Sequence, residues 1–167
     1  MPREQSAVRR GSRAGAGIAE IGCTAEITTV TKEYSDGRLD LIAHGRQRFE
    51  VLQLDRERSF LRAEILALPD EPADADQLEK ERAIAAHKEI LALAGAAPDA
   101  SAAAPGTLSF HLAGSLPLDL DFKQKLLSTL SERERMHELA AYLESILPGL
   151  RRAARAKEKA GGNGQAR

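Results

Sequence analysis

A tight turn between alternating segments constrains the fold of this chain more than any other feature. Asp36 and Gly37 supply the positive φ angles that a two-residue β-hairpin turn requires. Residues 24–34 form one predicted strand, and residues 39–44, in which apolar and polar side chains alternate, form its partner. A period of two is typical of antiparallel strands with one buried face. The hairpin therefore predicts a half-buried antiparallel sheet.

The alternation continues beyond the hairpin. It recurs at residues 49–51 and 61–65, which predicts a β-meander over residues 20–68. The breaks are expected at Gly45 and Arg46, at the charged residues 55–58, and at the Pro-Asp-Glu-Pro sequence of residues 69–72. Proline ends the sheet because it cannot donate a hydrogen bond to a strand ladder.

The second half of the chain has helical spacing. Helices are predicted over residues 74–94, 107–112, 122–130 and 131–147, with an alanine-rich connection over residues 96–106. The first helix is expected to place Leu78, Ile84, Ala85 and Leu91 near its apolar face. Gly95 is predicted to stop this helix. Ser131 and Glu134 form a capping box that opens the last helix, and Pro148-Gly149 is predicted to close it.

Together these elements predict one α+β domain, an antiparallel β-meander followed by a C-terminal helical bundle. The predicted parts are a disordered basic leader (1–17), a sheet part (18–70), a helical part (71–150) and a disordered basic tail (151–167). The net charge of −1 hides an acidic body between basic ends. This distribution disfavours nucleic acid as a partner, because phosphate binding needs clustered Lys and Arg.

Composition also limits the cellular compartments in which the chain is expected. Cys23 is the single cysteine, so an internal disulfide cannot form, which favours the reducing cytoplasm. No stretch approaches the roughly 18 apolar residues of a membrane span. The sequence therefore predicts a cytoplasmic protein without membrane contact.

Two blocks carry a family resemblance. The first is GCTAEITTVTKEYSDGRLDLIAHGRQRFEVLQ (residues 22–53), which resembles the middle of the N-terminal substrate-binding domain of Lon-type ATP-dependent proteases. The second is LSFHLAGSLPLDLDFKQKLLSTLSERERMHELAAYLESIL (residues 108–147), which resembles the helical half of the same domain. The resemblance covers most of residues 17–150 in the family's order. It implies a PUA-like pseudo-barrel and a stand-alone Lon-domain-like protein.

The start of the chain departs from this family pattern. Members begin with a Pro-Leu-Phe-Pro-like strand and a Leu-x-Ile-Phe-Glu-x-Arg-Tyr-like strand and helix, and residues 1–21 resemble neither. The expectation is an incomplete pseudo-barrel, either because these strands are absent or because the true start lies upstream. A meander that begins at Ile21 leaves a sheet edge and an apolar face uncovered, which predicts self-association or pairing with a partner strand.

No catalytic, metal or cofactor residue is predicted. The chain has neither the G-x-x-x-x-G-K-[ST] phosphate loop nor a recognisable Ser-Lys peptidase segment. His44, His87, His111 and His137 lack a second ligand at metal-binding spacing and are interpreted as surface or packing residues. Cys23 is interpreted as a small buried residue, Arg46 and Arg48 as neighbours on one solvated face, and Lys123 and Gln124 as structural.

The function implied by the resemblance is non-catalytic binding of unfolded or degron-bearing polypeptides for ATP-dependent proteolysis. A protease or chaperone is the implied partner, and the substrate-binding residues stay unassigned because an apolar strip or sheet edge cannot be located from sequence. One alternative is a PUA-like RNA-binding module, which the acidic body disfavours. Another is a truncated fragment without independent function.

Overall fold

The computed structural model describes residues 17–72, 74–97 and 106–162. The elements are β1 (Ile21–Glu33), β2 (Leu39–Asp55), β3 (Arg62–Ala67), α1 (Gln77–Ala94), α2 (Leu108–Gly114), α3 (Leu120–Ser128) and α4 (Glu132–Gly162). The strands form one antiparallel sheet in the order β1-β2-β3, which confirms the meander and the α+β class. The predicted leader, apart from Gly17, and most of the alanine-rich connection lie outside the described residues.

The hairpin turn lies where it was predicted but is longer than two residues. The backbone N–H of Tyr34 donates to Arg38 O at 2.9 Å, and Gly37 N donates to Tyr34 O at 3.0 Å. Gly37 adopts a φ of 85°, which a residue with a side chain rarely adopts. Asp36 Oδ1 accepts from Arg38 N at 3.2 Å and stabilises the loop.

The second and third predicted strands are one element. β2 continues through Gly45 and Arg46, so the predicted break there is wrong. The strand has a bulge here. Cys23 stands opposite Arg48 and Ala25 opposite Gly45, so two steps along β1 face three steps along β2. A Cβ at Gly45 would lie 3.3 Å from Cys23 Sγ, so glycine here permits the two strands to approach closely.

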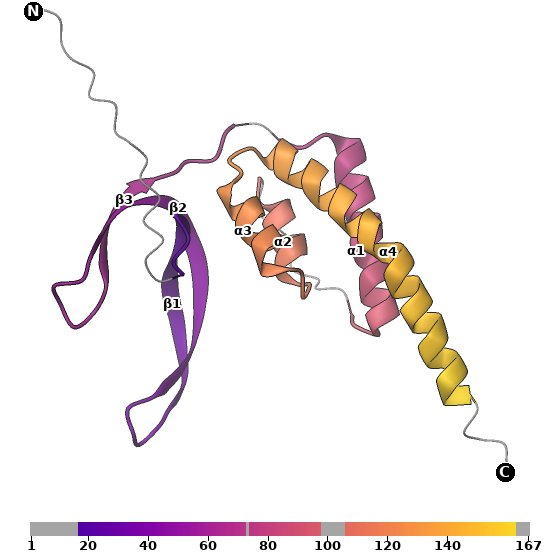
Figure 1. The fold of residues 1–167 in the computed structure, drawn as a ribbon, viewed down its shortest axis with the longest axis horizontal. Coiled ribbons are helices and arrows are strands. Elements are labelled where there is room, and N and C mark those ends of the chain that lie inside the picture. Colours follow the sequence, from indigo (N-terminus) through magenta and orange to yellow (C-terminus); the bar gives the residue numbers. More distant parts are fainter. Residues whose placement is uncertain (1–16, 73, 98–105, 163–167) are drawn as a thin grey trace, which may run out of the picture.

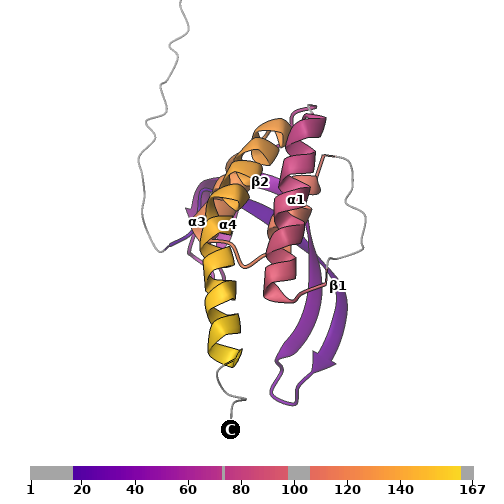
Figure 2. The ribbon, with the colours of Figure 1, turned by 90° about the vertical axis from the view of Figure 1, so that its right-hand side faces the viewer.

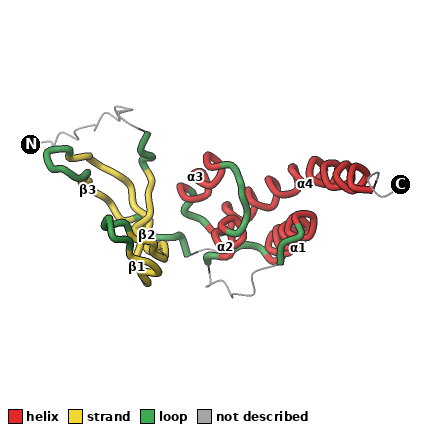
Figure 3. The backbone as a smooth tube through the Cα atoms, turned by 90° about the horizontal axis from the view of Figure 1, so that it is seen from below, coloured by secondary structure: helices red, strands yellow, loops and turns green. Residues whose placement is uncertain are grey.

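The sheet is much more exposed than its alternation predicted. Ile27 is 59% exposed, Leu41 44% and Ile65 45%. The prediction of half-buried strands is therefore wrong. Figures 1 and 3 show the reason: the sheet lies beside the helices rather than under them, and the two parts meet near one end of the sheet.

The hydrophobic core lies entirely among the helices. Its buried residues are Ala75, Ala83, Ala86, Ile90, Leu91, Leu112, Ala113, Leu116, Leu118, Leu126, Met136, Leu139, Ala140, Leu143 and Leu147. On α4 the buried residues recur at the i, i+3, i+4 spacing of one helix face. On α1 the predicted face is partly wrong, because Leu78 is 66% exposed and the small Ala83 and Ala86 face the core instead.

Helices α1 and α4 lie side by side and run in the same direction (Figures 1 and 2). Arg82 pairs with Glu144, with Nη2 2.6 Å from Oε2, and Arg151 pairs with Glu89, with Nε 2.6 Å from Oε1. Arg82 and Glu89 are seven residues apart on α1, and their partners are seven residues apart on α4. The second ion pair therefore lies about two turns further along both helices than the first. This register holds the core faces of the two helices together.

Helix boundaries differ from prediction mainly at the last helix. Gly95 ends α1 with a φ of 69°, as predicted. α3 begins two residues earlier than predicted because the Asp119 side chain caps its first N–H groups. α4 passes through Pro148 and reaches Gly162, so its predicted end and the predicted disorder of residues 151–162 are wrong. Contact of Arg151 with α1 and the helix-favouring alanines that follow explain the extension.

Candidate polypeptide-binding surface

Arg48 joins the sheet to the helices. Its side chain is 5% exposed, and its Nη1 donates to Leu127 O at 2.9 Å and to Thr129 O at 2.7 Å, just after α3. Its Nη2 lies 2.5 Å from Asp70 Oδ1. Burial lowers the pKa of the Arg48 guanidinium, and the Asp70 carboxylate opposes that shift. The orientation of β2 against the helices is fixed through these bonds.

Arg135 of α4 completes this connection from the helical side. Its side chain is fully buried, and its Nη1 donates to the same Asp70 Oδ1 at 2.9 Å. Glu132, one turn earlier, accepts from Arg135 Nη2 at 2.8 Å and from Ser109 Oγ at 2.6 Å. The Phe110 ring lies 4.4 Å from Arg135 Cζ and 5.6 Å from Arg48 Cζ. We call Arg48, Asp70, Phe110, Glu132 and Arg135 the joint cluster.

Gln124 supplies a second connection. Its Nε2 donates to Ile21 O at 2.9 Å, so α3 is tied to the start of β1 and the structural interpretation of this residue is confirmed. Lys123 contributes a backbone N–H to Asp119 O at 3.0 Å in the first turn of α3. The beginning of the sheet is therefore anchored, while the rest of the hairpin extends away from the helices (Figure 1).

Irregularities in the β1–β2 ladder determine which side chains share a face. The register shifts at Thr24, Thr28 and Thr31. At each shift a threonine hydroxyl bonds the facing strand: Thr28 Oγ1 donates to Ile42 O (3.2 Å), Thr31 Oγ1 to Asp40 O (3.1 Å) and Thr24 Oγ1 to Gln47 O (3.3 Å). The hydroxyls thus satisfy backbone carbonyls where the regular ladder is interrupted.

These bulges gather apolar side chains on one face of the hairpin. Directly opposed residues in an antiparallel pair point to the same face, and the register places Val30 opposite Leu41 and Ile27 opposite Ala43. Leu41 and Ala43 share a face because they are two residues apart. Ile27 and Val30, three apart, share it as well because Thr28 is an extra residue between them. With Leu39, this face holds five exposed apolar residues.

We call Ile27, Val30, Leu39, Leu41 and Ala43 the hairpin strip. The exposed fractions of its large side chains range from 44% for Leu41 to 59% for Ile27. β1 has β2 on one side, and its other side has no strand partner within residues 17–72, 74–97 and 106–162. An apolar strip beside an open edge is the arrangement that accepts an added strand, whose backbone bonds the edge and whose side chains contact the strip.

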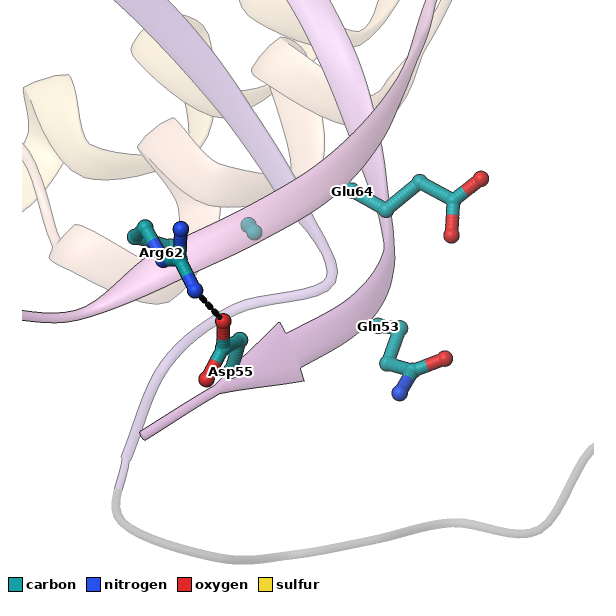
Figure 4. A pocket seen from close by; sticks show the side chains of 5 residues that line it. Gln53, Asp55, Arg62 and Glu64 are labelled. Atoms are coloured by element: carbon teal, nitrogen blue, oxygen red, sulfur yellow. Dashed lines mark hydrogen bonds and ion pairs between the residues drawn. The ribbon is translucent and has the colours of Figure 1, made fainter. Parts of the chain in front are cut away.

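The far end of the sheet carries a polar depression instead (Figure 4). Gln53, Asp55, Arg62, Ala63 and Glu64 line it, with a volume of about 360 Å³. Asp55 and Arg62 stand opposite each other and form an ion pair. Their charges satisfy each other at the surface, so the depression has neither a buried charged group nor an activated nucleophile.

A second depression lies between the first turns of α1 and α4. Asp76, Glu79, Arg133, Glu134, His137 and Glu138 line it. Arg133 Nη2 lies 3.6 Å from Asp76 Oδ1, and His137 Nδ1 lies 3.4 Å from Glu79 Oε1. Exposed ion pairs of this kind contribute little energy, and we interpret them as surface contacts between the two helices.

The two arginines predicted to share a face lie on opposite faces. Arg46 is exposed and pairs with Glu26 across the strands, whereas Arg48 is buried in the joint cluster. The prediction assumed unbroken alternation. The bulge opposite Thr24 inserts one residue into β2 and reverses the phase, so Arg48 points toward the helices and Arg46 points away from them.

The remaining candidate residues lie in different parts of the structure, apart from two histidines. His44 and His137 are exposed, while His87 is buried on α1 and His111 lies half-buried on α2 near it. Cys23 was expected to be buried and is exposed, because nothing among the described residues covers its part of the hairpin. In the described parts of the chain, no group of three His, Cys, Asp or Glu residues is placed to hold a metal ion. No helix there combines the length and apolarity needed to cross a bilayer.

His87 makes the stability of the helical part dependent on pH. Its Nε2 lies 2.6 Å from Ser115 Oγ, and burial, with a smaller effect of nearby His111, lowers the pKa of His87. The neutral ring therefore stabilises the fold at pH values above the unfolded pKa of about 6.5. This contribution is lost as the pH falls through the lowered folded pKa.

We expect urea unfolding to show a decline in the free energy of unfolding between pH 7.5 and pH 5, and His87→Gln to flatten that decline. His44→Gln is the matched control, because His44 is exposed and should leave the slope unchanged. The lowered pKa values of Asp74, Glu89 and Glu144 act in a more acidic range and do not compete in this window. An unchanged slope in His87→Gln would contradict the assignment.

Comparison with known proteins identifies relatives of this arrangement. The family model described as the ATP-dependent protease La (LON) substrate-binding domain matches residues 4–145. The match begins upstream of residue 17, where the sequence resemblance began. Among solved structures, a Lon N-terminal domain protein from Xanthomonas campestris is similar, with a TM-score of 0.56 and 21% identity over 74% of this chain and 68% of that one. No curated protein matches the chain significantly.

Proposed function

Because this chain belongs to the Lon substrate-binding domain family, we propose that it binds unfolded or degron-bearing polypeptides along β1. The observation that carries the proposal is the hairpin strip beside the edge of β1 that has no strand partner in the described part of the chain. A client segment would add as a strand to residues 22–33 and place alternate side chains over Ile27 and Val30. The start of β1 is unsuited to this, because Ile21 O is already bonded to Gln124.

The proposed role is binding rather than catalysis. The matched family model is a substrate-binding domain, and neither an ATPase nor a protease domain is found in this chain. The partner that we propose is a protease or chaperone that acts on the bound client. The free thiol of exposed Cys23 suits a reducing, cytoplasmic setting.

A direct test uses a permanently unfolded, reduced and alkylated polypeptide labelled for fluorescence anisotropy. Val30→Lys and Leu41→Lys place a charge on the strip at positions that are 51% and 44% exposed, so neither should disturb the helical core. Each is expected to weaken binding about tenfold, which corresponds to about 1.4 kcal/mol. Circular dichroism and thermal melts would confirm that both variants remain folded.

The matched control is Leu120→Lys. Leu120 is 78% exposed but lies on α3, outside the strip, so this variant should bind the client as the parent chain does. Equal binding by the strip variants and the parent would contradict the proposal. Tight binding of a structured RNA hairpin, with a steep loss of affinity on adding salt, would instead favour the RNA-binding alternative.

A further inference from the structure

We propose that two copies of this chain pair through their β1 edges, antiparallel about a two-fold axis, to form one six-stranded sheet. This inference goes beyond the proposed function because it requires no client. Both requirements of a symmetric strand pairing are present: an edge of β1 without a strand partner among the described residues, and side chains along that edge that complement themselves when the strand is reversed.

The apolar side chains set the register. When β1 is reversed against itself about Thr29, with the bulge residue Thr28 passed over, Ile27 stands opposite Val30 of the partner subunit. Both residues belong to the hairpin strip and therefore lie on the same face, as residues opposed across an antiparallel pair must. Because the axis is two-fold, the contact occurs twice, and the two hairpin strips join into one apolar surface across the new sheet.

The charged side chains agree with this register on the opposite face. Glu26 stands opposite His44 in β2, and Lys32 stands opposite Asp40. His44 and Asp40 are four residues apart in an unbroken part of β2, so Glu26 and Lys32 share the face away from the strip.

Outward from Ile27 and the partner's Val30, the next residues to meet are Glu26 and Lys32 of the partner subunit. Thr31 is passed over because it is the extra residue of the existing bulge. The pairing therefore places opposite charges together twice. Glu26 is also paired with Arg46, and the Lys32 ammonium lies 4.3 Å from the centroid of the Tyr34 ring. The side chains of Glu26 and Lys32 are thus both held on the face opposite the hairpin strip.

Such a dimer would use the same edge that the proposed function gives to clients. Free chains would bind clients and paired chains would not, so client binding would dissociate the dimer. Concentration of the chain would then regulate how much open edge is available.

Sedimentation velocity over a range of concentrations tests the pairing without any client. The parent chain is expected to shift from monomer to dimer as its concentration rises. Lys32→Glu, which brings carboxylates together twice, should raise the dimer dissociation constant about tenfold. Glu26→Lys should weaken the dimer as well, and the double variant Glu26→Lys with Lys32→Glu should recover most of the loss, because opposite charges meet again.

Two further variants locate the contact. Val30→Lys is expected to give a monomer at every concentration, while Leu120→Lys on α3 should dimerise as the parent does. A parent chain that stays monomeric throughout the range overturns the proposal. So does a dimer that Lys32→Glu leaves unchanged, or one that the double variant fails to restore. Client binding is measured separately by anisotropy, so failure of the dimer and failure of the proposed function are distinguishable.

Discussion

Replacing Arg135 with methionine is expected to lower the free energy of unfolding by about 3–5 kcal/mol, since removing one partner of a buried ion pair leaves the other charge uncompensated. Arg135 is fully buried, and the Glu132 carboxylate beside it is 3% exposed. Methionine fills similar space but donates no hydrogen bond, so Asp70 and the carbonyls of Thr129 and Leu130 also lose donors. For a chain of this size the melting temperature should fall by roughly 6–20 °C.

The matched control is Arg151→Met, made on the same helix. Arg151 pairs bidentately with Glu89, but its side chain is 49% exposed, so the loss should be small. Adding Glu132→Leu to Arg135→Met should recover part of the stability, because the buried carboxylate is then removed together with its cation. If Arg135→Met has the same melting temperature as Arg151→Met, the joint cluster does not hold the sheet and the helices together.

The joint cluster was missed because its charges look like a solvated run. Residues 132–135 read Glu-Arg-Glu-Arg, which suggests the exposed first turn of a helix. The signal that could have identified the two buried members is their phase: Glu132 lies four residues before Met136 and Arg135 four residues before Leu139, on the stripe that faces the core. A charged residue on an apolar stripe indicates a buried partner, which sequence alone cannot name.

Elements with local causes could be predicted, and those with long-range causes could not. Gly37 in the hairpin turn and Gly95 at the end of α1 follow from backbone preferences of single residues. The bulges at Thr24 and Thr28 depend on where β2 lies, and they decide which side chains share a face. Alternation indicated that the faces of the sheet differ, but it carries no information on whether another element covers one of them.

The buried core lies among the helices and not in the sheet, so the second large effect is expected from truncating a core side chain. Leu139→Ala on α4 removes a side chain that is fully buried and should lower the free energy of unfolding by about 2–5 kcal/mol. Leu41→Ala on β2 deletes the same atoms from a side chain that is 44% exposed, and should change it by no more than about 0.5 kcal/mol. Urea unfolding followed by circular dichroism measures both values on otherwise identical chains.

Hydrogen exchange should show the same division. Amides of the β1–β2 hairpin beyond the joint cluster are expected to exchange through local opening, while those of α4 around Leu139 exchange at the cost of global unfolding. A large loss of stability in Leu41→Ala would mean that the strip is covered in solution. If that loss disappears on dilution, the cover is a second copy of the chain, since an intramolecular contact does not depend on concentration. If it persists at every dilution, another part of the same chain lies over the strip, and clients must displace that part to bind.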